Sequence, residues 1–152
     1  MAIRTILPQT EPTLHKVCRP VTEFNEHLWR NLEDMKDTLH AAQGVGLAAP
    51  QIGILRRYFV IDTGEKMVEI INPVIAEEEG VQEEIEGCLS CPGEYGITRR
   101  PKRVKIKGQD RNGQPIEVEG EDIIARGLCH ETDHLDGILF KVHVVREVPE
   151  EK

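Results

Sequence analysis

The sequence predicts an α+β fold in which antiparallel β-sheet packs around an α-helix. Three observations lead to this prediction: an amphipathic helical pattern early in the chain, several short β-type segments after it, and a second helical pattern near the end. The chain has 152 residues, enough to bury a hydrophobic core without disulfides. No repeat or linker divides it, so we expect one domain over residues 1–152 with a disordered tail at 149–152.

The first long helix is predicted after Asn25, a residue type that often caps helix N-termini. Four apolar residues then recur at spacings of four and three, which places them on one buried face. They are Leu28, Leu32, Met35 and Leu39. Trp29 is expected in the core with them, and Gly44 is expected to end the helix. A shorter helix is expected at residues 14–18.

Short β-strands are predicted between the two helical patterns. Residues 58–61 and 68–71 are rich in β-branched side chains. Residues 104–107 and 116–119 alternate apolar with polar side chains, as strands with one buried face do. Asn112-Gly113 lies between the second pair and favours a tight hairpin turn.

The second helix is predicted over residues 123–135, because Glu121 and Asp122 place negative charge at its N-terminus. After it, residues 138–140 and 142–148 have the composition of a closing strand. The basic run at residues 99–103 is expected on a solvated strand edge.

Charge and composition exclude several classes of protein. The formal net charge is −8 and the hydrophobic fraction is 39%, so we expect a globular protein without direct nucleic-acid binding. The N-terminal residues lack the apolar core of a secretory signal, and no segment approaches the roughly 20 apolar residues of a membrane helix. We therefore expect a cytoplasmic protein that does not bind membranes and keeps its cysteines reduced.

The most informative motif is His130-Glu131-Thr132-Asp133-His134, inside the second predicted helix. Residues four apart share a helix face, so both imidazoles can bind one metal ion. Glu131 would lie beside the ion, where its carboxylate could transfer protons. A helix whose histidines merely pair with surface carboxylates stays open as an alternative.

A catalytic metal site of this kind usually has three protein ligands and one position for water. The sequence leaves several candidates for the third ligand open: His15, His27, His40, His143, the carboxylates and the cysteines. Cys88 is distinguished by its setting in Glu86-Gly87-Cys88-Leu89-Ser90, where Gly87 permits close backbone approach. An isolated cysteine is more often a small buried hydrophobic residue.

A third segment is rich in small residues. Residues 44–51 read Gly-Val-Gly-Leu-Ala-Ala-Pro-Gln, and Gln51 offers both an amide donor and an acceptor. The segment lacks the Lys-Ser/Thr ending of a phosphate loop and follows a helix instead of a strand. A nucleotide site is therefore not expected.

The order and spacing of these three motifs resemble the peptide deformylase family, and the resemblance extends from Ile3 to Phe140. It implies that family's fold, with antiparallel β-sheets packed around a central metal-binding α-helix. It also implies a hydrolase that removes the formyl group from the N-terminal formyl-methionine of new polypeptides and releases formate. The partners implied are N-formylmethionyl nascent peptides, with transient proximity to the ribosome.

The resemblance further implies a metal centre. Cys88, His130 and His134 would bind one divalent metal ion, with Fe2+ as the native ion and Zn2+, Ni2+ or Co2+ as alternatives. A metal-bound water would attack the formyl carbon. Glu131 would act as general base and then pass the proton to the leaving amine.

Substrate contacts are implied in the same way. Gln51 and the backbone N–H of Leu89 would donate to the developing oxyanion. The peptide would lie extended, with its backbone paired to Val45, Gly46 and Gly87. The methionine pocket is expected to be lined by four residues of the histidine helix, Ile123, Arg126, Gly127 and His130.

The sequence also allows two alternative kinds of zinc protein. A zinc endopeptidase would need a third ligand downstream, but His143 lies outside the known spacings. A structural zinc site would use Cys88, Cys91, Cys129 and one histidine, and would leave no position for water. Cys91 and Cys129 are interpreted here as packing residues.

Overall fold

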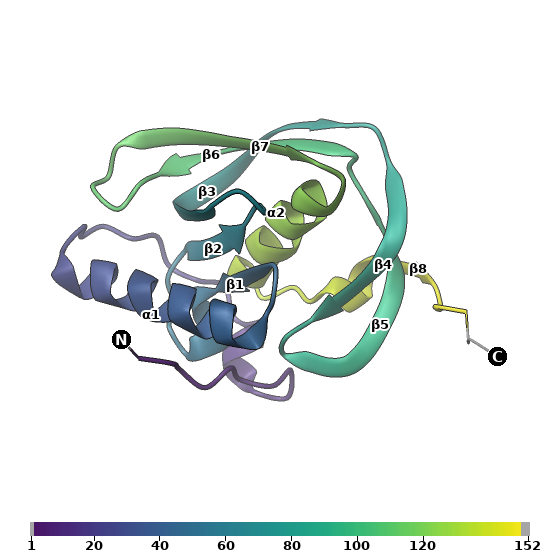
Figure 1. The fold of residues 1–152 in the computed structure, drawn as a ribbon, viewed down its shortest axis with the longest axis horizontal. Coiled ribbons are helices and arrows are strands. Elements are labelled where there is room, and N and C mark those ends of the chain that lie inside the picture. Colours follow the sequence, from purple (N-terminus) through teal and green to yellow (C-terminus); the bar gives the residue numbers. More distant parts are fainter. Residues whose placement is uncertain (1, 150–152) are drawn as a thin grey trace.

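The structure is a computed structural model that describes residues 2–149 (Figure 1). The tail that was expected to be disordered, residues 149–152, lies outside the described residues except for Pro149. The helices of the described part are α1 and α2 together with the short 3-10 helices η1, η2 and η3. Their bounds are Glu26–Ala42 for α1, Asp122–Leu135 for α2, Pro12–His15 for η1, Ala49–Ile52 for η2 and Phe140–His143 for η3.

The strands form two antiparallel sheets. The five-stranded sheet has the order β1-β2-β3-β6-β7 and the three-stranded sheet has the order β4-β5-β8. The first contains β1 (Gly46–Ala48), β2 (Tyr58–Asp62), β3 (Met67–Glu79), β6 (Arg103–Gln109) and β7 (Pro115–Glu121); the second contains β4 (Gln82–Cys88), β5 (Cys91–Arg100) and β8 (Val144–Arg146). Figure 1 shows α2 at the centre, between the two sheets. The predicted fold class is therefore confirmed.

Helix α1 forms for the reasons that the sequence indicates. The side chain of Asn25 accepts a hydrogen bond from the Leu28 backbone N–H at 3.2 Å, which caps the first turn. All four residues of the predicted apolar face are buried. Trp29 is only half-buried, because its indole N–H donates to the Arg111 carbonyl at 2.7 Å near the surface. The helix ends one residue before Gln43, whose left-handed φ of 54° precedes Gly44.

Strand β2 places the five-stranded sheet between the two helices. Side chains alternate between the faces of a strand. Phe59 and Ile61 accordingly pack in the cluster that contains Leu128 of α2, whereas Tyr58 and Val60 pack with the buried face of α1. The sheet therefore holds α2 on one face, and the opposite side of α2 is left to meet the three-stranded sheet.

Several predicted boundaries differ in the structure. The strand predicted at residues 68–71 is the start of the much longer β3. The Asn-Gly turn sits in a wider loop, where Asp110 accepts hydrogen bonds from the backbone of Asn112 and Gln114 at 2.9 and 3.0 Å. The helix predicted at residues 14–18 is the 3-10 helix η1, since Pro12 favours a short first turn.

Two further predictions were wrong in part. The closing strand predicted over residues 138–140 and 142–148 is instead the 3-10 helix η3 followed by the three-residue strand β8, with no strand at residues 138–140. The basic run at residues 99–103 is not uniformly solvated: Arg100 is buried, because its side chain points inward from β5 and pairs with Glu86. The hairpin of β4 and β5, which carries both residues, was not predicted.

Candidate metal centre

The structure brings one cysteine and two histidines to a single point. His130 and His134 share a face of α2, and Cys88 is the last residue of β4. The His134 Nε2 atom lies 3.3 Å from Cys88 Sγ and 3.2 Å from His130 Nε2. The three donor atoms lie within 4.8 Å of one another, so a single ion can contact all of them. Of the residues that the structure describes, only these form such a group.

The polar surroundings of these donors fit a bound divalent cation. The Nδ1 of His130 lies 2.7 Å from Glu86 Oε2, which leaves Nε2 as the atom directed at the centre. Burial and the charge of His130 hold the pKa of His134 well below its usual range, so this ring is a neutral donor. Burial opposes protonation of His130, but nearby Glu131, Cys88 and Glu86 raise its pKa well above the usual value. A positive charge at this point is therefore electrostatically favourable.

Glu131 lies beside the donors without joining them. Its Oε2 is 4.0 Å from His130 Nε2, and its Oε1 is buried with no hydrogen-bond partner among the described residues. Burial raises the pKa of this carboxyl to about 7. A Cβ at Gly46 would come within 2.7 Å of Glu131 Oε2, so a larger residue at that position would displace the carboxylate. A group with this pKa can both accept and donate protons near neutral pH.

A buried ionic network contacts His130 on the Nδ1 side of its ring, away from the other metal-binding residues. Arg100 donates to the two oxygens of Glu86 at 3.1 and 2.7 Å, and to Asp133 at 2.7 Å. Burial alone would raise the pKa of Glu86, but hydrogen bonds from His130 and Arg100 lower it to about 2. Glu86 is thus a permanent carboxylate that fixes the His130 ring. Arg100 was not predicted to support the site, since its only signal in the sequence is its place in a basic run.

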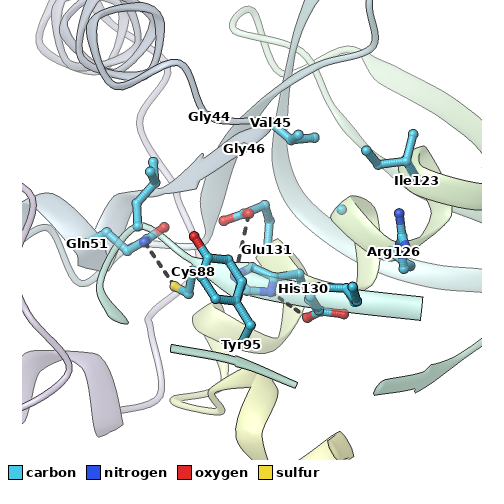
Figure 2. A pocket seen from close by; sticks show the side chains of 15 residues that line it. Gly44, Val45, Gly46, Gln51, Cys88, Tyr95, Ile123, Arg126, His130 and Glu131 are labelled. Atoms are coloured by element: carbon cyan, nitrogen blue, oxygen red, sulfur yellow. Dashed lines mark hydrogen bonds and ion pairs between the residues drawn. The ribbon is translucent and has the colours of Figure 1, made fainter. Parts of the chain in front are cut away.

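Gln51 and Leu89 lie next to Cys88. The Gln51 carbonyl oxygen accepts a hydrogen bond from the Ala48 backbone at 2.9 Å, which fixes the side chain. Its amide nitrogen then lies 3.1 Å from Ser90 Oγ and 3.7 Å from Cys88 Sγ. In Figure 2 a dashed line joins Gln51 to Cys88 and marks the second of these contacts. Leu89, like Gln51 and Cys88, lines the cavity that opens onto the metal-binding residues.

A cavity of about 300 Å³ opens onto this centre. Its walls come from the β1 segment, from the end of β4 and from α2, and both β1 and β4 are edge strands of their sheets. The substrate and pocket residues expected from the sequence all line it: Val45, Gly46, Gly87, Ile123, Arg126, Gly127 and His130. Figure 2 shows Ile123 and Arg126 on one side of the cavity, away from Gln51.

The remaining candidate ligands do not join the centre. The three-residue group does not include His15, His27 or His40. It does not include His143 either, whose Nε2 lies 3.0 Å from Asp133 Oδ2. Cys129 is buried in the core around α2, where burial raises its thiol pKa to about 12. The cysteine-rich closed zinc site is therefore not formed.

Two imidazoles, a thiol and a free buried carboxylate beside an open cavity define the class of metal-dependent hydrolases. The polypeptide deformylase family model matches residues 3–150. The chain belongs to the peptide deformylase family. Among the described residues, no helix has the length and apolar character needed to span a membrane.

Individual relatives agree with this assignment. A peptide deformylase of Thermoanaerobacter pseudethanolicus is 53% identical over 152 residues, covering 100% of this chain and 96% of that protein. The crystal structure of a peptide deformylase from Legionella pneumophila has a TM-score of 0.91 at 44% identity, covering 94% of this chain and 86% of that one. The peptide deformylase of Thermotoga maritima also has a TM-score of 0.91, at 41% identity, covering 98% and 100%.

Proposed function

We propose that Cys88, His130 and His134 hold the divalent metal ion of this enzyme and that Glu131 transfers its protons. As a peptide deformylase, the chain hydrolyses the formyl amide of N-formylmethionyl peptides and releases formate. The observation that supports these residue roles is the group of three donor atoms within 4.8 Å of one another. This group lies directly beside the buried Glu131 carboxylate, and two of its members, Cys88 and His130, line the cavity.

When bound, the ion supplies Lewis acidity, which lowers the pKa of water and polarises the formyl oxygen. Glu131 takes the proton of the attacking water, because its carboxylate is adjacent to the donors and has no other partner among the described residues. It then delivers that proton to the leaving amine nitrogen. Burial raises the pKa of this carboxyl, which favours its acceptance of the proton.

Two donors are assigned to the charge that develops on the formyl oxygen. The Gln51 amide N–H is held toward Cys88 by the hydrogen bond from the Ala48 backbone to its carbonyl oxygen. The backbone N–H of Leu89 follows Cys88 directly. Donors that are fixed before the reaction stabilise an oxyanion without reorganisation.

The peptide lies between the facing edges of β1 and β4. Val45 and Gly46 offer backbone groups on one side, and Gly87 offers them on the other. The methionine side chain enters the cavity toward Ile123 and Gly127. Position 87 is suited to glycine, because a Cβ there would lie 2.7 Å from Tyr95 Cε1.

We further propose Fe2+ as the native ion, since imidazole and thiolate ligands suit iron as well as zinc. The substrates are new polypeptides, which supports a cytoplasmic location with transient proximity to the ribosome. We also propose that residues 1–152 form one domain, since the three motifs that build the site span the chain from residue 44 to residue 134.

Anaerobic metal reconstitution tests this proposal. Metal-free protein is loaded separately with Fe2+, Zn2+, Co2+ or Ni2+, and release of formate and of free amine from a formyl-Met peptide is measured. We expect activity with a divalent ion and the highest turnover with Fe2+. Higher turnover with Zn2+ would contradict the choice of iron, and no turnover with any ion would contradict the site.

A further inference from the structure

The N-terminal segment contacts the two parts of the chain that carry the proposed oxyanion donors. The backbone N–H of Leu7 donates to the Gln51 carbonyl at 2.7 Å, and the backbone N–H of Gln9 donates to the Ser90 carbonyl at 2.9 Å. Gln51 carries one donor, and Ser90 directly follows Leu89, which carries the other. We call the segment from Leu7 to Gln9 the strap, because it joins these two parts of the chain.

The sequence of the strap favours this double contact. The residue between the two donating N–H groups is Pro8, which has no N–H of its own and a fixed φ. Proline also restricts the residue before it, Leu7, to extended conformations. Pro8 is exposed to solvent, so its missing N–H leaves no buried acceptor without a partner. The strap is therefore stiff and makes its two contacts through Leu7 and Gln9.

Side chains fix one end of the strap. The Gln9 side chain accepts a hydrogen bond from Lys141 Nζ at 2.6 Å and donates one to Glu94. Lys141 Nζ in turn lies 2.9 Å from Glu94 Oε1. Glu94 belongs to β5 and Lys141 to η3, so Gln9 is held between these two elements.

The chain beyond the strap is anchored to the metal-binding helix. Leu14 of η1 is fully buried, and the Cys18 backbone N–H donates to the carbonyl of Leu135, the last residue of α2, at 2.8 Å. A Cβ at Gly137 would lie 2.7 Å from the backbone carbon of His15, so the chain passes close to the end of α2. The N-terminal segment thus contacts each of the three parts of the chain that build the site.

These contacts restrict the movement of both oxyanion donors. Gln51 Nε2 lies 3.1 Å from Ser90 Oγ, so the two parts of the chain also contact each other. Displacing a reacting group by about 1 Å can cost on the order of 10²-fold in rate. Because the oxyanion develops only during the reaction, the positions of its donors affect turnover more than substrate binding.

We propose that the strap is a positioning element for the oxyanion donors, in which the N–H groups of Leu7 and Gln9 act through Gln51 and Leu89. This inference rests on the proposed function. Of the described residues that line the cavity, none belongs to the strap, so it has no direct contact with the substrate site. Loss of either backbone hydrogen bond is therefore expected to lower kcat and to leave KM unchanged.

The test replaces single backbone amides with esters, which removes one N–H and keeps every side chain. Cys18 makes this possible, because a synthetic thioester of residues 1–17 can be joined to recombinant residues 18–152 by native chemical ligation. The full chain is then refolded and loaded with metal, and wild-type protein made in the same way is the reference. Esters at Leu7 and at Gln9 each remove one strap bond. An ester at Lys16 is the matched control, since that N–H donates to the Thr13 carbonyl at 3.4 Å and contacts neither donor segment.

Each strap ester should lower kcat for a formyl-Met peptide by about tenfold, which is less than the roughly 10²–10³-fold cost of losing an oxyanion donor itself. The control ester should leave kcat unchanged. KM should be unchanged in all three proteins. The absorption band of thiolate-bound Co2+ should also be unchanged, which shows that the metal centre has formed.

A second perturbation separates positioning from a general effect on structure. In a Gln51→Met background the Leu7 ester should have no further effect on kcat, because the donor that it positions is already gone. The Gln9 ester should still lower kcat there, since it acts through Leu89.

Recombinant variants repeat the comparison without ligation. Gln9→Pro and Gln9→Ala both lose the side chain, but only proline also loses the backbone N–H. We expect kcat to be lower in Gln9→Pro than in Gln9→Ala, at equal KM and with the cobalt band present in both.

The outcomes distinguish this inference from the proposed function. Equal kcat in the strap esters and the Lys16 ester would overturn the positioning role. So would a Leu7 ester that lowers kcat equally with and without the Gln51 amide, or strap esters that raise KM at constant kcat. A recombinant wild type that cleaves no formyl-Met peptide would instead contradict the proposed function.

Discussion

Replacing Arg100 with methionine should destabilise the protein more than any neighbouring charge change. Arg100 is 4% exposed, and it pairs with the buried carboxylate of Glu86 and with the half-buried carboxylate of Asp133. Removing one partner of a buried ion pair costs about 3–5 kcal/mol, because the other charge stays buried without compensation. We expect the free energy of unfolding of metal-free Arg100→Met protein to fall by that amount.

The same substitution should weaken metal binding. Glu86 lies 2.7 Å from His130 Nδ1, and its low pKa depends on Arg100. Without Arg100 the pKa of Glu86 rises and the His130 ring is held less firmly. Loss of a group that orients a metal ligand through a hydrogen bond typically lowers metal affinity about 10- to 100-fold. A zinc titration against a chromophoric chelator measures this change.

Arg99→Met is the matched control. Arg99 pairs with Glu83 at 2.8 Å, but its side chain is 61% exposed, and exposed pairs contribute only about 0–1 kcal/mol. Urea unfolding of both variants at neutral pH gives the comparison. If Arg100→Met loses no more stability than Arg99→Met, and binds zinc as tightly as the wild type, the network has no supporting role.

Three further predictions follow from the site. Glu131→Gln should keep its metal and lose about 10²–10⁴-fold in turnover, measured by formate release; activity within about tenfold of the wild type would exclude Glu131 as the acid–base group. Acetyl-Met peptides should be cleaved at least about 10²-fold more slowly than formyl-Met peptides, because the added methyl displaces the reacting carbon; comparable specificity constants would contradict this. Folding lowers the pKa of Glu86 from 4.5 to about 2, so its stabilisation is present above about pH 4.5 and is lost as pH falls toward 2. Urea unfolding of metal-free protein across this range should show a loss of up to about 3 kcal/mol from Glu86, and a smaller loss in Arg100→Met; equal losses would refute the coupling.

Helix α1 and the histidine motif could be predicted because their signals are local. The Asn25 cap and the apolar face depend only on spacings within a few residues. The same holds for the two histidines on α2, which are four residues apart. The third donor, Cys88, comes from a distant strand, so its place followed from the resemblance to a family and not from periodicity.

The β4–β5 hairpin was missed because its inward face does not carry an apolar pattern. Glu86, Thr98 and Arg100 are buried there, since they hold one another and His130. Adjacent arginines also take opposite environments: Arg99 is exposed and Arg100 is buried, as alternation along a strand requires. Composition cannot distinguish these two arginines. The burial of the residues that support the site could therefore not be predicted from the sequence.

Cobalt substitution tests the central claim most directly, because a thiolate bound to Co2+ gives a charge-transfer absorption band. We predict this band in the cobalt-loaded wild type and in Cys91→Ser, and its loss in Cys88→Ser. Cys91 is a close control, since it pairs with Cys88 in the β4–β5 register but is outside the donor group. A band that persists in Cys88→Ser, or that disappears in Cys91→Ser, would contradict the assigned metal centre.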